Sequence, residues 1–255
     1  MLIALRNNQR IIPTATGQRA NCPECSTEVL SKCGEINIWH WAHVTTVNCD
    51  IWGEPEGEWH LNWKKDLPLD WVEVVMEQGE CKHRADIRLP TGLVIELQHS
   101  PISVEDIHKR EAFYQNMIWI FDLSELPKSE ESENAVGFYD EDYWTNDLLI
   151  DLKLEDEDDG YVEIAETYIE PRFILRQWSG KDANYRTFRW KHARKHIAYA
   201  KKPVFLDLGN NQLLRLKKMY SESPVGGWGF LVERERLVQS IVDGKLSLRR
   251  RSASA

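Results

Sequence analysis

The sequence predicts a mixed α/β protein whose central part has the element order α-β-β-β-α-β. Apolar residues occupy every second position in residues 87–89 and 93–97, which is the period of a half-buried strand. Pro90, Thr91 and Gly92 separate the two runs, as a turn would. The flanking segments complete the order with a helix over residues 56–66, a strand over 71–76, a helix over 104–115 and an apolar strand over 117–123.

The length of this turn decides which side chains share a face of the hairpin. A two-residue turn would leave Asp86 and Glu96 on opposite faces. A three-residue loop over residues 90–92 pairs Asp86 with Glu96 and gathers the apolar side chains on the other face, and Gly92 suits the left-handed backbone of such loops. We therefore predict that Asp86, Glu96 and Gln98 lie on one surface. The other predicted pairs are Arg84 with Gln98, Ile87 with Ile95, and Leu89 with Leu93.

Two carboxylates on one surface repel each other unless a positive charge lies between them. A divalent cation with oxygen ligands, Mg²⁺ or Mn²⁺, is the usual solution, and such an ion can activate water and bind a phosphate. We predict Asp86 and Glu96 as its ligands, with Glu58 as a possible third ligand from the first helix. An isolated D-x9-E-x-Q pattern is more often the ordinary polar face of a hairpin, so the prediction depends on the elements around it.

Several short motifs support a functional interpretation of the hairpin. They are C-P-E-C at residues 22–25, W-H-W-A-H at 39–43, E-W-H-L-N-W-K at 58–64, R-A-D at 84–86, I-E-L-Q-H-S at 95–100 and R-E-A-F-Y at 110–114. With the element order, they resemble the competence protein CoiA-like family of the PD-(D/E)xK nuclease superfamily. The resemblance implies a restriction-endonuclease-like core and metal-dependent DNA cleavage, with Asp86, Glu96 and Gln98 as the catalytic residues. Gln98 stands where the general superfamily pattern has a lysine, and it cannot supply a lysine's charge.

A second candidate metal site precedes the hairpin. Cys22 and Cys25 are separated by two residues, as are His40 and His43, and paired thiolates and imidazoles are typical ligands of tetrahedral Zn²⁺. We predict a structural zinc knuckle with these four ligands, and Cys33 or Cys49 could replace one histidine. Five cysteines concentrated near one end suit metal binding in a reducing compartment better than disulfides.

The net charge of -9 conceals two segments of opposite sign. Residues 124–168 contain sixteen acidic residues and two lysines, which indicates an insertion or loop that could recruit a protein partner. Residues 171–220 contain thirteen lysines and arginines against two aspartates, which provides the basic surface that DNA binding requires.

The basic segment contains a predicted amphipathic helix over residues 185–202. Trp190 and Ile197 lie on its apolar stripe, and Arg189, Arg194 and Lys195 on its charged face are predicted DNA contacts. A solvated helix would show the same pattern. Strands over residues 204–208 and 212–216 and a helix over residues 231–242 complete a C-terminal α+β extension.

Three further residues are predicted to contact DNA: Lys64 on the first helix, and Arg110 and Tyr114 on the second. The predicted domains are a zinc-binding region (1–53), a nuclease core (54–123), an acidic insertion (124–170) and a basic extension (171–255). The sequence contains neither a signal peptide pattern nor an apolar run of about 20 residues, so we expect a cytoplasmic protein without a membrane span. The predicted function is that of a Mg²⁺- or Mn²⁺-dependent DNA nuclease that handles foreign or incoming DNA. The alternatives are an inactive DNA-binding module and a zinc-stabilised interaction scaffold.

Overall fold

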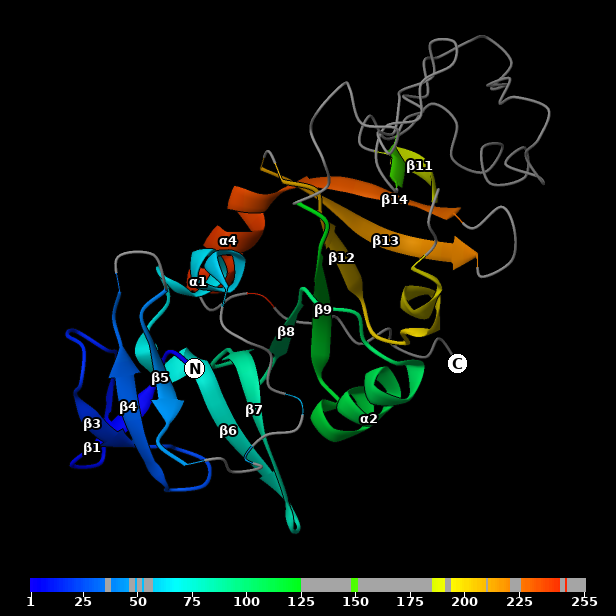
Figure 1. The fold of residues 1–255 in the computed structure, drawn as a ribbon. Coiled ribbons are helices and arrows are strands. Elements are labelled where there is room, and N and C mark those ends of the chain that lie inside the picture. Colours follow the sequence, from blue (N-terminus) through cyan, green and yellow to red (C-terminus); the bar gives the residue numbers. More distant parts are fainter. Residues whose placement is uncertain are drawn as a thin grey trace, which may run out of the picture. The chain divides into compact units, whose positions relative to one another are not determined.

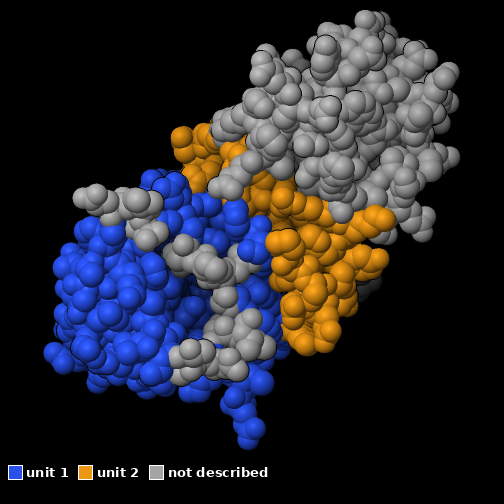
Figure 2. All heavy atoms as spheres, in the orientation of Figure 1, with its two compact units in different colours: residues 1–100, 110–119, 237–255 blue, residues 101–109, 120–236 orange. Residues whose placement is uncertain are grey.

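The chain forms two compact units, which are coloured separately in Figure 2. Unit 1 contains residues 1–100, 110–119 and 237–255, and unit 2 contains residues 101–109 and 120–236. The computed structural model describes residues 1–34, 38–45, 49, 52, 57–124, 148–150, 185–190, 194–209, 211–220, 226–243 and 246 (Figure 1). The predicted acidic insertion lies almost entirely outside these residues.

The N-terminal part of unit 1 is a five-stranded antiparallel sheet with the strand order β2-β1-β3-β4-β5 (Figure 1). Its strands are β1 (Ala4–Arg6), β2 (Gln9–Ile11), β3 (Arg19–Asn21), β4 (Glu28–Lys32) and β5 (His40–His43). Alternate side chains of β4 are buried, and Val29 packs with Trp41, Ala4 and Ala20 in a small core. The region predicted as a zinc knuckle is therefore a complete sheet that contains the cysteine turn.

The rest of unit 1 follows the predicted order of elements. It comprises α1 (Glu58–Lys64), the short 3-10 helix η1 (Leu69–Trp71), β6 (Val72–Gln78), β7 (Cys81–Arg88), β8 (Val94–Gln98), the second half of α2 (Val104–Tyr114) and the first half of β9 (Met117–Asp122). The strand order is β9-β8-β7-β6. Every residue of β8 and β9 is buried, as expected for strands covered on both faces. The predicted α-β-β-β-α-β order is confirmed.

The β7–β8 hairpin has the predicted three-residue loop. Ile87 pairs with Ile95, and the Leu89 N–H donates to the Leu93 carbonyl at 2.9 Å. Gly92 has a φ of +77°, the left-handed conformation that the loop needs. Continued along the strands, this register places Asp86 opposite Glu96.

Unit 2 is built on the strand order β10-β11-β14-β13-β12-β9. Besides β9, these strands are β10 (Leu148–Ile150), β11 (Tyr185–Trp190), β12 (Val204–Asp207), β13 (Gln212–Tyr220) and β14 (Gly226–Glu233). The strands predicted over residues 204–208 and 212–216 are confirmed. The predicted final helix begins three residues later than expected, as α4 (Arg234–Val242), which is divided between the two units.

The prediction of a helix over residues 185–202 is wrong. Its first part is strand β11, which pairs with both β10 and β14, and its last part contains the short 3-10 helix η2 (Lys195–Tyr199). Residues 185–190 include Tyr, Thr, Phe and Trp, which favour sheets. Pairing on both edges satisfies the backbone hydrogen-bonding groups of β11. Strand β14 was not predicted from the sequence, because glycines dominate its start.

Within the described part of the chain, no helix has both the length and the apolar character needed to cross a membrane.

Candidate zinc cluster and carboxylate site

Four metal-ligating side chains meet at one end of the N-terminal sheet. Cys22, Cys25, His43 and Cys49 each offer a ligand atom, and these atoms all lie within 4.8 Å of one another. The Cys25 Sγ atom is 3.3 Å from His43 Nε2, and the Cys22 Sγ atom is 3.6 Å from Cys49 Sγ. Tetrahedral Zn²⁺ with Zn–S bonds of about 2.3 Å would separate two sulfurs by about 3.8 Å. The Cys3His cluster is consistent with a structural zinc site.

The predicted ligand His40 is replaced by Cys49, one of the two alternatives. Both His40 and His43 belong to strand β5, where successive side chains point to opposite faces of the sheet. Positions three apart therefore point in opposite directions, and only His43 reaches the cysteines. The His40 Nδ1 atom instead lies 2.7 Å from the Ile38 carbonyl.

The electrostatics of the cluster favour a bound cation. Burial raises the pKa of the Cys49 thiol, and the neighbouring Cys22 raises it further. Burial raises the pKa of Cys22 as well, whereas hydrogen bonds such as that with Thr27 lower the pKa of Cys25, so without a cation the thiolates of Cys22 and Cys49 would be disfavoured. Burial and the positive charge of Arg84 lower the pKa of His43, which keeps its imidazole in the neutral form that metals bind.

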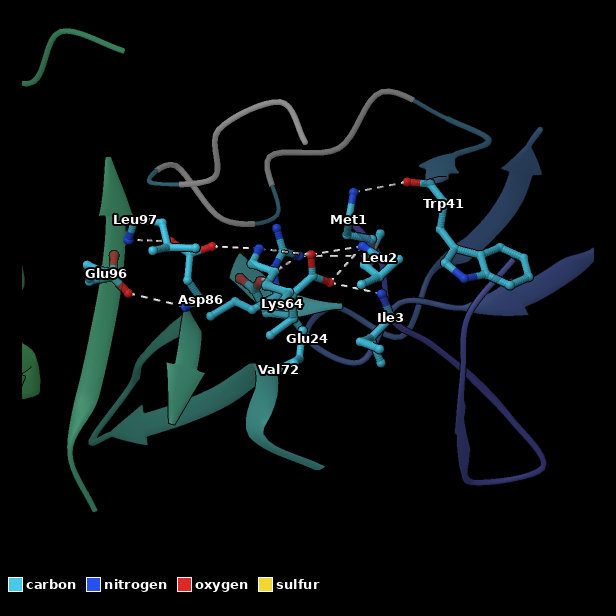
Figure 3. Close-up of polar contacts among 12 residues, drawn as sticks. Met1, Leu2, Ile3, Glu24, Trp41, Lys64, Val72, Asp86, Glu96 and Leu97 are labelled. Carbon is cyan, nitrogen blue, oxygen red and sulfur yellow. Dashed lines mark hydrogen bonds and ion pairs between the residues drawn. The ribbon is translucent and has the colours of Figure 1, made fainter. Parts of the chain in front are cut away.

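The second site is the polar face of the β7–β8 hairpin, where Asp86 and Glu96 meet (Figure 3). The Asp86 Oδ2 atom accepts a hydrogen bond from the Leu97 N–H at 3.0 Å, and Glu96 Oε1 lies 3.3 Å from the Asp86 N–H. Each carboxylate thus contacts the backbone of the opposite strand. The Asp86 side chain is 23% exposed and the Glu96 side chain 3%, so Asp86 is the carboxylate open to solvent.

Two cations hold this pair from opposite ends. Lys64 Nζ, from α1, lies 2.8 Å from Asp86 Oδ1. Arg110 Nη1, from α2, lies 3.1 Å from Glu96 Oε2, while Arg110 Nη2 donates to the Trp52 carbonyl at 3.0 Å. The sequence predicted both cations as DNA contacts, and both are instead buried against the carboxylates. Their contact with DNA stays a prediction.

The two carboxylates have opposite protonation preferences. Burial and the negative charge of Asp86 raise the pKa of Glu96 to about 8, although Arg110 partly opposes the rise. Burial acts in the same direction on Asp86, but the charges of Lys64 and His60 outweigh it and lower the pKa of Asp86. Two neighbouring acids, Glu96 buried and Asp86 partly open to solvent, form a site that an additional cation would stabilise.

Glu73 is a third buried acid beside the pair, which the sequence did not reveal. Its Oε1 atom is 3.7 Å from Lys64 Nζ, and its carboxylate accepts hydrogen bonds from the backbone N–H groups of Leu2 and Ile3 at 2.8 to 2.9 Å. Glu73 lies in a strand with a φ of +49°, which is rare for a residue other than glycine. A single sequence offers no signal for that conformation.

Gln98 lies in β8, two residues after Glu96, and it is buried. Alternation along the strand puts Gln98 on the same face as Glu96. Its Nε2 atom donates to the Ser100 carbonyl at 2.8 Å, which fixes the amide plane. The predicted convergence of these two side chains therefore agrees with the strand geometry, and the catalytic role of Gln98 stays a prediction.

The structure places the other predicted residues as follows. Glu58 is exposed in the first turn of α1, and Tyr114 is buried at the end of α2 with its ring against Trp52 and Phe113. In unit 2, Arg189 lies in β11, Arg194 donates to the Asp122 carbonyl at 3.0 Å, and Lys195 is exposed at the start of η2. Their predicted roles as metal ligand or DNA contacts stay predictions.

The zinc cluster and the carboxylate site are also connected. Trp52 follows Cys49 by three residues, stacks on His83 with ring centroids 3.3 Å apart, and accepts the hydrogen bond from Arg110. Glu24 stands between the ligands Cys22 and Cys25 in the sequence, and its Oε2 atom lies 3.9 Å from Arg84 Nη1 on strand β7. Neither connection could be predicted from the sequence, because neither Trp52 nor Glu24 belongs to a metal-ligand pattern.

Comparison with known protein families agrees with this division into two sites. Residues 56–143, which include the carboxylate hairpin, match the model described as "Competence protein CoiA, nuclease-like domain". Residues 5–52, which include the cluster, match the model described as "Competence protein CoiA, N-terminal domain". In the sequence, the nuclease-like domain thus follows an N-terminal domain that contains the Cys3His cluster. It belongs to the competence protein CoiA family, as the resemblance predicted. No curated protein and no solved structure matches the chain in the same comparisons.

Proposed function

We propose that this protein is a metal-dependent DNA nuclease with a restriction-endonuclease-like core. The observation that carries the proposal is the meeting of Asp86 and Glu96 on one face of the β7–β8 hairpin, within the residues that match a nuclease-like domain. The handling of foreign or incoming DNA would be consistent with the competence family.

The residues present fit a hard divalent cation. Asp86 and Glu96 offer carboxylate oxygens, which Mg²⁺ and Mn²⁺ prefer, and Asp86 is partly open to solvent. Burial and the negative charge of Asp86 raise the pKa of Glu96, and a bound cation would favour its ionised form. When bound, such an ion lowers the pKa of water and stabilises charge on a phosphate.

The chain's own residues would orient the reactants. In hydrolysis a water oxygen bonds to phosphorus and loses a proton to solvent, the bond from phosphorus to one sugar oxygen breaks, and that oxygen takes up a proton as it leaves. Gln98 would hold the water through its amide, whose plane the bond to Ser100 fixes, but an amide cannot accept the water's proton. The Leu97 N–H holds Asp86 in place, and Arg110 does the same for Glu96. Arg189, Arg194 and Lys195 would bind the DNA backbone from unit 2.

One observation favours a second function, that of a DNA-binding module without catalysis. The Asp86 Oδ1 atom already has a cation at 2.8 Å, the ammonium of Lys64, and an internal ion pair can replace a metal in a site that has lost its activity. The two functions differ in one measurable respect. Only the nuclease cleaves DNA when a divalent metal is added.

The test is a cleavage assay with linear, circular, single-stranded and double-stranded DNA in Mg²⁺, Mn²⁺ or chelator. The variants are Asp86→Asn and Glu96→Gln, with Asp66→Asn, an exposed acid just after α1, as the matched control. Zinc content is measured after chelation, so that loss of the Cys3His metal is not mistaken for loss of a catalytic ion.

We expect the wild type and Asp66→Asn to cleave only with added metal. Asp86→Asn and Glu96→Gln should fall to the rate seen with chelator while they still bind DNA. Glu58→Gln tests the remaining predicted ligand, because only a direct ligand should lower metal affinity when it is neutralised. A wild type that binds DNA in a salt-sensitive manner without cleavage would establish the binding module instead.

A further inference from the structure

Lys64 is the only buried lysine among the residues whose burial the structure describes. Its side chain is 1% exposed, and burial of an ammonium group is unfavourable unless acids pair with it. The Nζ atom has two such partners, Asp86 Oδ1 at 2.8 Å and Glu73 Oε1 at 3.7 Å. α1 thus places a cation beside the one carboxylate of the hairpin pair that faces solvent (Figure 3).

The backbone around Glu73 is arranged to hold this cation. A left-handed conformation inside a strand is strained for glutamate, and such strain persists only where surrounding contacts enforce it. Here the N–H groups of Leu2 and Ile3 fix the carboxylate in place. Glu73 therefore has a fixed position on the second side of the Lys64 ammonium.

The other polar groups of the site cannot provide the same charge at this position. Hydrolysis of a phosphodiester increases negative charge on the phosphoryl oxygens, which a preorganised positive group stabilises. Gln98 offers only a neutral dipole. Arg110 pairs with Glu96, whose side chain is 3% exposed, whereas Lys64 pairs with Asp86, the carboxylate that is open to solvent.

We propose that Lys64 supplies the positive charge that contacts the scissile phosphate and that Glu73 is the residue that positions it. This inference rests on the proposed nuclease function. It gives the buried ammonium a role in the reaction rather than the passive role of neutralising Asp86.

Single-turnover cleavage measured against DNA concentration at saturating Mn²⁺ tests the proposal. The variants are Lys64→Met, Lys64→Arg and Lys65→Met, where Lys65 is the exposed neighbour at the end of the same helix. Mn²⁺ affinity and thermal unfolding are measured for each variant. These measurements separate a role in the reaction from roles in metal binding and stability.

We expect Lys64→Met to lower the maximal rate on the order of 10²- to 10³-fold, the usual effect of removing one group that stabilises transition-state charge. Its Mn²⁺ affinity should not weaken, because the lost ammonium competes for Asp86. Lys64→Arg should recover part of the rate, and Lys65→Met should match the wild type.

A passive neutralising role predicts a different result, since bound Mn²⁺ would then replace the ammonium. Lys64→Met with a wild-type maximal rate at saturating Mn²⁺ would therefore overturn the proposal. Should Lys64→Met fail to fold, Glu73→Gln provides the second variant, because its amide oxygen still accepts the Leu2 and Ile3 N–H groups. Glu73→Gln should lower the maximal rate without changing the DNA concentration that gives half of that rate. An unchanged maximal rate would remove Glu73 from the proposal. An inactive wild type contradicts the nuclease function itself, before any Lys64 variant is compared.

Discussion

The Cys3His cluster and the carboxylate pair differ in how their negative charge is balanced. Both gather acidic groups in places with little solvent, but the four ligand side chains of the cluster are all neutral or negative. The carboxylate pair has its own cations, Lys64 and Arg110. We therefore expect that the N-terminal sheet depends on a metal for its stability, whereas the hairpin should fold without one.

Removal of a cluster ligand should have the largest effect. Cys49→Ser should abolish stoichiometric zinc binding and lower the free energy of unfolding by about 4 kcal/mol or more, because loss of a structural metal is among the most destabilising changes. Metal analysis and thermal unfolding measure these effects. Cys33→Ser is the control, since Cys33 lies outside the cluster and contacts Thr16 through its backbone. Equal zinc content in both variants would exclude the Cys49 assignment.

Loss of an internal cation should have the next largest effect. Arg110→Met leaves Glu96 buried without its partner, and breaking a buried ion pair costs about 3 to 5 kcal/mol. Lys109→Met on the same helix removes an exposed pair with Glu105, which solvent screens and which should therefore contribute far less to stability. Urea unfolding of both variants gives the difference. Similar destabilisation by the two changes would show that the hairpin does not depend on its own cations.

The pH dependence of stability should identify Glu96. Its pKa rises from 4.5 to about 8 in the folded protein, so near neutral pH the folded state binds a proton that the unfolded chain releases. Without added divalent metal, the free energy of unfolding should therefore fall as pH increases from about 4.5 to 8, by at most about 1.4 kcal/mol per pH unit. Glu96→Gln or saturating Mg²⁺ should flatten this slope. A slope that Glu96→Gln leaves unchanged would assign the titration to another group.

The smallest effect should come from the histidine that points away from the cluster. His40→Ala should retain zinc, because strand alternation directs His40 to the other face of β5. His43→Ala should lose zinc or bind it weakly. Zinc content and competition with a chelator measure both variants, and zinc loss in His40→Ala would restore the ligand set predicted from the sequence.

The sequence alone determined the local features of the carboxylate site. Alternation of apolar residues and the Pro90–Gly92 loop were sufficient to predict the β7–β8 register, because a shift by one residue would expose the entire apolar face. The same local periodicities predicted α1, α2, β6 and β9 close to their observed bounds. The two-residue spacings within the Cys22/Cys25 and His40/His43 pairs predicted Cys22, Cys25 and His43 as candidate zinc ligands.

Tertiary structure decided everything that depends on contacts between distant segments. Cys49 follows Cys25 by more than twenty residues, so only the closure of the sheet brings their sulfurs together, whereas the strand conformation of β5 excludes His40. Residues 185–190 begin a segment predicted as a helix but are rich in residues that favour sheets, and their pairing with β10 and β14 made them a strand. Lys64 and Arg110 looked like surface contacts, but the folded chain buries each beside a carboxylate. Sequence periodicity reports which side of an element is apolar, and only the packed structure determines which charges face each other across it.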